Sequence, residues 1–239
     1  MMVHYHIMPR PLTLSDLLSV GAASGLATRL CKLTSMEVTA ACADQQLQAL
    51  RQCTGLTHLH ISVIDLQERV SVELAAALQG LHSLTRLHVS GYKLRGDNVV
   101  VPLASAVQHL TQLQHLHLAK NDIGVAALTA LVPALSAMPA LQTLVINCKC
   151  LRPADRVAWT EALCTLLIVV PGLTHLNAGR NSMRDEGLAL LAPALRGMTR
   201  LQHLDLSHNF VGSRGTAAIA PALAALPNLQ TLDLSGCGS

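Results

Sequence analysis

The stretch LQHLHLAKNDIG, Leu113 to Gly124, carries leucines at its first, fourth and sixth positions. His115 and His117 alternate with these leucines along the chain. Alternation with a period of two predicts a short β-strand, because successive side chains of a strand point to opposite faces. We therefore expect the leucines to face a core and the histidines to lie on the exposed face.

The same pattern recurs along most of the chain. Its first leucine falls at Leu56, Leu84, Leu113, Leu141, Leu173, Leu201 and Leu229. The intervals are 28, 29, 28, 32, 28 and 28 residues, and a weaker unit is expected to start at Leu30. A fixed period of this length is the sequence signature of a repeat array.

The second half of each unit is rich in alanine and leucine at helical spacing, as in EGLALLAPALRGMTRL. Pro133, Pro193 and Pro221 recur near the end of this half, which predicts a local kink in each helix. Asn121 stands at the ninth position of its unit, as do Asn181 and Asn209 in theirs. An asparagine there is expected to turn its amide onto backbone groups after the strand.

These residues resemble the leucine-rich repeat family, in its ribonuclease-inhibitor-like class with 28–29-residue units. The resemblance covers the chain from Leu56 onward and implies a right-handed β/α solenoid, with a parallel sheet on the concave face and helices on the convex face. Strand and helix in alternation, with short links, independently require parallel strands joined by crossover helices. We expect residues 1–54 to form an N-terminal helical cap with a degenerate repeat. Residues 55–239 would form an array of about seven units, the last one incomplete.

Composition excludes several classes of protein. The formal charge of +3 is too small and too dispersed to indicate nucleic-acid binding. No uncharged apolar run reaches the roughly 18 residues of a membrane-spanning helix. Only four residues are aromatic, so leucine and alanine must fill the core.

The seven cysteines fit no zinc-site spacing, and we interpret them as reduced apolar filler in a reducing compartment. The N-terminus lacks a clean secretory signal. We therefore expect an intracellular protein, most simply cytoplasmic. A mitochondrial presequence and a cytoskeletal or flagellar assembly stay open as alternatives.

The unit from Leu141 departs from the pattern. It is 32 residues long, has Lys149 at the asparagine position and contains Trp159, the only tryptophan of the chain. We expect a longer loop and a helix capped by Asp155. Trp159 is then either a loop contact for a partner or a product of ordinary repeat drift.

Polar side chains at the outward strand positions are the candidate binding surface. His60, His88 and His117 share position five on successive strands, so their rings are expected to form a column with a spacing of about 4.8 Å. We favour a polar, partly cationic recognition surface over a metal site, because no carboxylate or thiolate is expected beside the rings. A pH-sensing role is a third alternative, since stacked rings resist protonation. The predicted partner-binding residues are His58, His60, Arg86, His88, His115, His117, Lys120, His175, Arg180, His203, Asp205 and Asp233.

No constellation of nucleophile and base is expected. His203, Asp205 and Ser207 share one face, but alternate strand residues are about 6.6 Å apart and the aspartate lies in the middle, so the histidine cannot bridge the other two. We expect no catalytic residue, no bound metal and no cofactor. Charge instead varies along the face, basic near Arg86 and acidic at Asp205 and Asp233.

We therefore expect a non-enzymatic scaffold that binds a protein partner through its concave face or docks inside a larger assembly. Two alternatives stay open. One is a GTPase activator similar to the Ran GTPase-activating proteins, with Arg180 and Asn181 as its candidate residues. The other is a recognition-arm fragment of a larger receptor.

Overall fold

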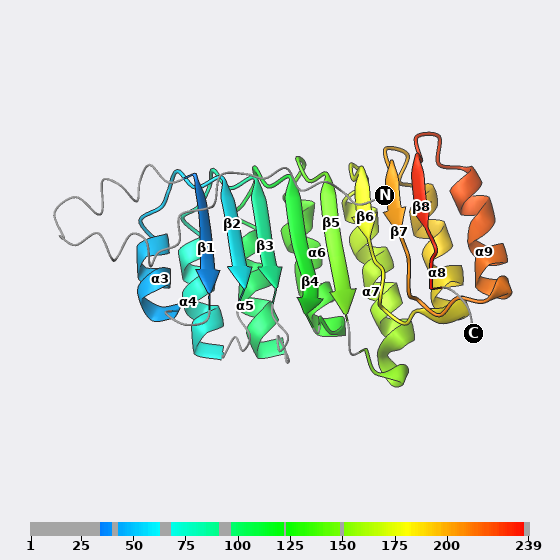
Figure 1. Cartoon of the computed structure of the whole chain (residues 1–239), viewed down its shortest axis with the longest axis horizontal. Helices are drawn as coiled ribbons and strands as arrows, with labels where there is room; N and C mark the ends of the chain where they lie inside the picture. Colours follow the sequence, from blue (N-terminus) through cyan, green and yellow to red (C-terminus); the bar gives the residue numbers. More distant parts are fainter. Residues whose placement is uncertain are drawn as a thin grey trace.

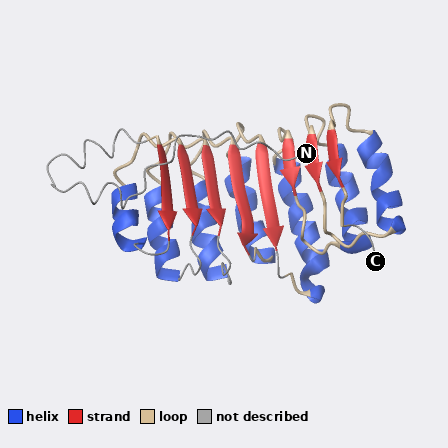
Figure 2. Cartoon of the chain, viewed as in Figure 1, coloured by secondary structure: helices blue, strands red, loops and turns tan. Residues whose placement is uncertain are grey.

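The computed structural model of the chain describes residues 34–39, 43–62, 68–90, 97–121, 123–148 and 151–236. Within these residues, eight parallel strands form one sheet in strict sequence order. Helices alternate with the strands and cover one face of the sheet (Figures 1 and 2). The chain is therefore the β/α solenoid that its repeats predict.

The strands are short and similar in length. They are β1 (Ser35–Thr39), β2 (His58–Ser62), β3 (Arg86–Ser90), β4 (His115–Asn121), β5 (Thr143–Cys148), β6 (His175–Asn177), β7 (His203–Asp205) and β8 (Thr231–Asp233). The helices are α3 (Ala43–Leu50), α4 (Glu68–Leu78), α5 (Asp97–Val107), α6 (Val125–Ser136), α7 (Arg156–Val169), α8 (Arg184–Arg196) and α9 (Ser213–Ala224), with a 3-10 turn, η2 (Pro153–Asp155), before α7.

The core lies between the sheet and the helix layer, and the repeated leucines build it. Leu56, Leu84 and Leu113 have no exposed surface, and the leucine three positions after each is equally buried. Each helix ends in a tight turn that leads into the next strand, as where the Leu84 amide donates to the Leu81 carbonyl at 3.0 Å. The leucine period thus sets both the packing and the chain reversal.

Neighbouring strands hold one register. Leu59 pairs with Leu87 and His60 with His88, and equivalent pairs follow along the sheet. The carbonyl at position two accepts two amides of the next unit, as Thr57 does from Thr85 at 2.9 Å and from Arg86 at 3.0 Å. One register shift occurs among these pairs, between Leu118 and Asn121 where β4 meets β5.

The N-terminal part of the array differs from the prediction in its alignment. Met36 pairs with Leu59 and Val38 with Ile61, so this unit is offset by three residues from the expected start at Leu30. Its strand β1 and helix α3, inside the predicted segment 1–54, continue the same sheet and helix layer. The weak leucine pattern there concealed the register, because Met36 and Val38 replace two of the repeated leucines.

Prolines lie inside four helices, which continue through them. Pro133, Pro193 and Pro221 occupy the equivalent place in α6, α8 and α9, as their spacing predicts. Pro102 lies inside α5, two residues earlier in its unit. The predicted kink at each proline stays a prediction.

The three asparagines after the strands are buried, as predicted, and bind backbone groups of two units each. The Asn209 side-chain amide donates to Leu206 of its own unit at 2.8 Å and to Ala178 of the preceding one at 2.9 Å. Asn121 and Asn181 make equivalent pairs of bonds. These side chains therefore join successive units where the chain leaves the sheet.

Candidate functional site

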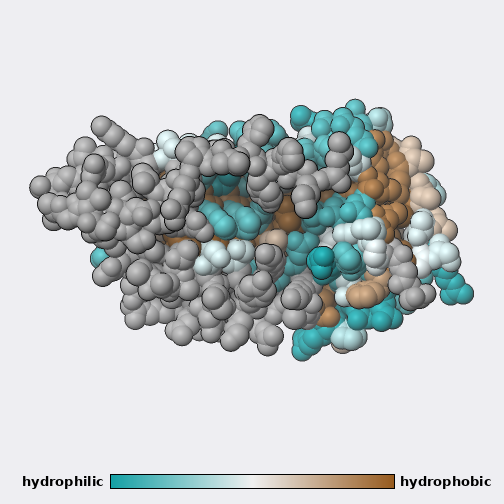
Figure 3. Space-filling model, in the orientation of Figure 1, coloured by the Kyte–Doolittle hydropathy of each residue, from teal (hydrophilic) through white to brown (hydrophobic). Residues whose placement is uncertain are grey.

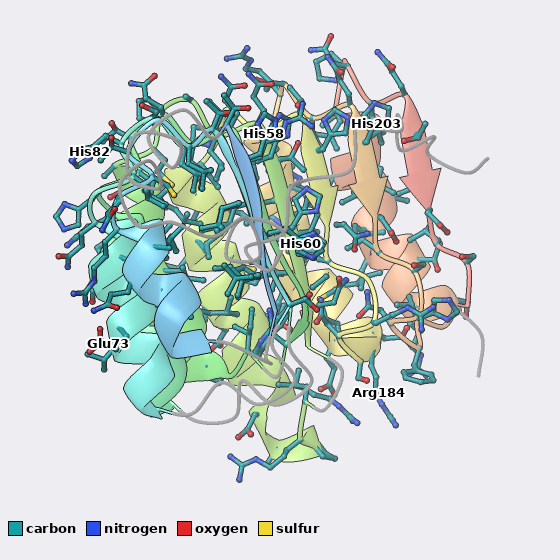
Figure 4. The ribbon with its side chains drawn as sticks, turned by 60° about the vertical axis from the view of Figure 1, so that its left-hand side comes forward. His58, His60, Glu73, His82, Arg184 and His203 are labelled. Carbon is teal, nitrogen blue, oxygen red and sulfur yellow. The ribbon has the colours of Figure 1, made fainter. Side chains whose placement is uncertain are left out.

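The outward side of the sheet, which we call the strand face, carries two parallel rows of side chains. Row three, counted from the first leucine of each unit, runs His58, Arg86, His115, Thr143, His175, His203 and Thr231. Row five runs His60, His88, His117, Val145, Asn177, Asp205 and Asp233. The sheet register aligns each row, and ten of the predicted binding residues fall in them. Figure 4 shows His58, His60 and His203 on the strand layer, and Glu73 and His82 beside the helices.

Row five contains the histidine column that the sequence predicts. The ring centroids of His60 and His88 are 4.3 Å apart, and those of His88 and His117 are 5.5 Å apart. The planes are tilted by 35° and 31°, so the rings stack without facing one another squarely. In the described part of the chain, no group of three or more His, Cys, Asp or Glu side chains is arranged to hold a metal ion.

Row three contains a second ring pair that sequence reasoning missed. His175 and His203 stack with centroids 4.2 Å apart and planes at 27°. The register pairing of these two residues was the available signal, since both stand at position three of consecutive units. The strand face therefore carries histidine stacks on both sides of β5.

Threonine hydroxyls hold the Nδ1 atoms of row three. Thr57 Oγ1 is 2.8 Å from His58 Nδ1, and Thr174 Oγ1 is 2.8 Å from His175 Nδ1. Each hydroxyl already donates its one hydrogen to a carbonyl of the preceding unit, Thr34 or Gln142. The neutral imidazole must therefore donate through Nδ1, which leaves Nε2 of His58 and His175 as the acceptor.

The histidines of both rows resist protonation. Burial is the first cause that lowers the pKa of His58, His115 and His117, and the positive charge of Arg86 is the second. The pKa of His115 falls to about 4. Burial followed by the charge of His203 lowers the pKa of His175. These rings are neutral at pH 7, so they do not supply the cationic character that the sequence suggested.

Arg86 supplies the positive charge of this region. Its side chain is exposed in row three between His58 and His115, and it has no ion pair within the described residues. Arg51 and Arg152 differ, since they pair with Glu73 and Asp155 at 2.6 Å. Arg86 is thus an unpaired guanidinium among neutral imidazoles.

The other end of the strand face is acidic and amide-rich. Asn147 donates to Asn177 Oδ1 at 3.0 Å, and Asn177 donates to Asp205 Oδ2 at 2.6 Å, so a chain of side-chain bonds crosses three strands. Hydrogen bonds from the side chain and backbone of Ser235 hold the pKa of Asp233 below its usual value. Both carboxylates therefore stay ionised at neutral pH, which confirms the predicted change of charge along the face.

The catalytic interpretation of His203, Asp205 and Ser207 fails in the structure as it did in the sequence. Ser207 is buried and its backbone amide donates to Asp205 Oδ1 at 2.9 Å. The Nδ1 atom of His203 lies 2.6 Å from the Thr231 hydroxyl instead. The three residues serve the sheet.

Trp159 corrects the prediction of a loop contact. It lies in α7, is fully buried, and donates from its indole Nε1 to the Ile123 carbonyl at 2.8 Å. Asp155 precedes the helix as expected but makes no capping bond, because its carboxylate accepts from Arg152 instead. The longer unit adds the 3-10 turn η2, and the tryptophan fills the core.

The remaining predicted residues lie beside the two rows. Arg180 follows β6 and is exposed, with a left-handed φ of 61°. Lys120 belongs to β4, but its side chain lies outside the described residues, as do Lys149 and Cys150. Cys53 and Cys164 are free thiols, and burial raises the pKa of Cys164 to about 11.

The surface of the strand face follows this division. Figure 3 shows hydrophilic groups over the middle of the face and a hydrophobic strip toward β8, where Leu232 is 40% exposed. No helix in the described ranges is long and apolar enough to cross a membrane.

The family model described as "Leucine Rich repeat" matches residues 109–132 and 198–220. No curated protein matches the sequence. Among solved structures, the leucine-rich repeat-containing protein LegL7 from Legionella pneumophila has 14% identity and a TM-score of 0.46, over 92% of this chain and 81% of that one. Leiomodin-1 actin-binding site 2 has 17% identity and a TM-score of 0.45, over 65% and 86%. The tropomodulin C-terminal domain of Caenorhabditis elegans has 12% identity and a TM-score of 0.42, over 77% and 92%.

None of these likenesses, all below a TM-score of 0.5, assigns a partner to this chain. The family-model matches fall on two of the units found by leucine spacing, those that contain β4 with α6 and β7 with α9. With the aligned leucines and the eight-stranded sheet, they make this chain a leucine-rich repeat protein.

Proposed function

We propose that the protein is a non-enzymatic scaffold that binds a protein partner across its strand face. The observation that carries the proposal is the pair of aligned polar rows, whose charge changes sign along one rigid sheet. Parallel strands lie about 4.8 Å apart, so Arg86 on β3 and Asp205 on β7 are separated by roughly 19 Å. A partner with an acidic group and a basic group at this separation matches both ends.

The neutral histidines between these ends suit a contact surface. Each imidazole offers a flat apolar face together with a donor or an acceptor. Threonine hydroxyls and ring stacking hold His115, His175 and His203 in place, so little side-chain freedom is lost when a partner binds. Pre-organisation of this kind favours recognition of one partner shape.

Three finer expectations belong to the same proposal. The 28–29-residue spacing supports the ribonuclease-inhibitor-like class. Cys53 and Cys164, both unpaired thiols, support an intracellular location. Work as a subunit of a larger complex is the third, and native complex mass in cell extract measures it.

Partner capture with charge-reversed variants tests the proposal. The tagged protein is cross-linked in cells, and captured proteins are quantified by mass spectrometry. The double variant Asp205→Lys, Asp233→Lys should lose its main partner by about tenfold or more, because two attractive contacts become repulsive. A matched double variant on the helices, Glu161→Lys, Glu186→Lys, should retain that partner. Equal capture by both folded variants would contradict binding through the strand face.

A further inference from the structure

The neighbourhood of Arg86 contains five imidazoles and no described carboxylate. In row three, the register places His58 on β2 and His115 on β4 directly beside Arg86. In row five, His60, His88 and His117 follow two residues later on the same three strands. All six side chains are at least partly exposed. An anion on this part of the strand face would therefore meet only cationic or neutral polar groups.

The charged and titratable groups around Arg86 can be named strand by strand. β1 contributes Glu37, whose backbone pairs with His60 at the far side of row five, and whose side chain lies outside the described residues. β5 contributes Thr143 and Val145, which do not titrate. Beyond β5 the next such group in row three is His175. Rings, not acids, thus surround the guanidinium on β2, β3 and β4.

We propose that Arg86 and the flanking rings of His58 and His115 bind an oxyanion of the protein partner, and that binding is coupled to proton uptake by these rings. This inference rests on the proposed function, because it names the chemistry of the partner at the basic end of the strand face. The oxyanion is a carboxylate or a phosphoryl group, since guanidinium binds both through paired N–H donors.

The ring hydrogen bonds explain why a proton would be taken up. His58 donates through Nδ1 to Thr57, so its Nε2 is a bare acceptor while the ring is neutral. A proton on Nε2 converts that acceptor into a donor and adds a positive charge. An oxyanion gains from both changes, whereas in the free protein the added charge would only repel Arg86.

Arg86 already influences these rings electrostatically. After burial, its charge is the next cause that lowers the pKa of His58, His115 and His117. An anion that neutralises Arg86 removes this second cause and raises each pKa. By linkage, the anion must then bind more tightly as the pH falls.

The experiment follows the histidine ring signals by NMR while the full chain is titrated from pH 7.5 to 5.5. Sulfate is the first probe, because it keeps both charges across this range, unlike phosphate with its second pKa near 6. Hexaglutamate and a phosphoserine peptide of equal length distinguish the two oxyanion sources, and hexaglutamine is the uncharged control. We expect the His58 and His115 signals to move with at least one acidic peptide, and affinity to rise about threefold or more between these pH values.

Three variants assign the effect. Arg86→Gln should abolish the response, and Arg196→Gln, an exposed arginine in the last turn of α8, should leave it unchanged. His115→Gln should keep binding at pH 7.5 but weaken its increase at low pH. This split separates proton coupling from a purely structural role.

Unmoved ring signals, or equal binding by Arg86→Gln, would overturn the inference. Binding of sulfate without either acidic peptide would overturn its assignment to a protein partner. If these tests fail while Asp205→Lys, Asp233→Lys still loses the captured partner, the proposed function stands and only the oxyanion site is wrong. If the oxyanion binds at Arg86 while that double variant keeps its partner, the proposed use of the whole strand face is wrong instead.

Discussion

The indole of Trp159 donates a hydrogen bond to the backbone carbonyl of Ile123, 36 residues earlier and 2.8 Å away. The bond joins α7 to the segment just before α6, and both residues are buried. Trp159 therefore fastens the long fourth unit to its neighbour from inside the core. Its position excludes it from direct contact with a partner while the array is folded.

The emission of Trp159 should report this burial. We expect a blue-shifted fluorescence maximum and weak quenching by acrylamide, because the ring has no exposed surface. Trp159→Phe should lower the free energy of unfolding by about 1–3 kcal/mol, since it leaves a smaller ring and an unpaired carbonyl. Urea unfolding followed by circular dichroism measures the change. Strong quenching in the native protein would contradict the buried position.

Asn209→Ala should destabilise the array through its neighbours. The side chain is fully buried, donates to two carbonyls, and accepts from the Asn181 amide at 3.0 Å. Removing it leaves several buried backbone groups unpaired, so we expect a loss of about 2–4 kcal/mol. Asn228→Ala is the control, because that amide also binds across units, to Thr199 at 2.8 Å, but is exposed. Its loss should stay below about 1 kcal/mol, and equal effects would argue against the bridging role.

Gly215→Ala should weaken the contact between α8 and α9. A Cβ atom at residue 215 would lie 2.6 Å from Asp185 Oδ1 and 2.8 Å from Asp185 Cα. Asp185 has little freedom to move, since its Oδ1 accepts from the Gly212 amide at 2.6 Å. We expect a net loss of about 1–3 kcal/mol in spite of the better helix propensity of alanine.

Gly197→Ala provides the comparison for Gly215→Ala. Gly197 follows α8 with ordinary right-handed angles, and the nearest atom to an added Cβ is 3.6 Å away. Alanine at residue 197 should therefore be neutral or stabilise by up to about 1 kcal/mol. Thermal unfolding of the two variants side by side measures the difference, and a similar loss in both would show that crowding at Asp185 is unimportant.

Stability should fall when the pH is lowered from about 6.5 to about 4. The pKa of His115 is about 4 in the folded protein and 6.5 as its ordinary value, so the unfolded chain binds more protons in this window. The contribution of His115 is therefore present above pH 6.5 and is lost as the pH falls. We expect about 1–2 kcal/mol from this ring, after allowance for solvent screening of a partly exposed group.

His115→Gln should flatten the fall in stability between pH 6.5 and pH 4, measured by urea unfolding at several pH values. His82→Gln changes an exposed histidine beside the helices and should keep the wild-type pH dependence (Figure 4). If His115→Gln follows the same curve as the unmodified protein, the acid sensitivity comes from other groups.

The repeated leucines were enough to predict the strands, the core and the two outward rows. Leu56, Leu84 and Leu113 each start a unit whose odd positions face outward, so the histidine column of row five followed from counting. The asparagine bonds were predictable for the same reason, since Asn121, Asn181 and Asn209 recur at one place after a strand. Local spacing decides these features, and spacing is visible in the sequence.

Features that depend on side-chain contacts between units were not predictable. The burial of Trp159 depends on how far the longer unit turns α7 toward Ile123, which the length of an insertion does not reveal. The low pKa of His115 depends on burial and on Arg86 one strand away. The alignment of β1 was missed because Met36 and Val38 give a weaker pattern than leucine does.

The constant register makes the units interchangeable in length. From β2 to β4 the paired residues are 28 or 29 positions apart, and from β6 to β8 they are 28 apart. A genetic duplication or deletion of 28 residues in either stretch would therefore rejoin leucine to leucine and row to row. It would change the number of strands and leave the remaining contacts as they were. The 32-residue unit between them lacks this property, so the array has two modular halves around one fixed joint.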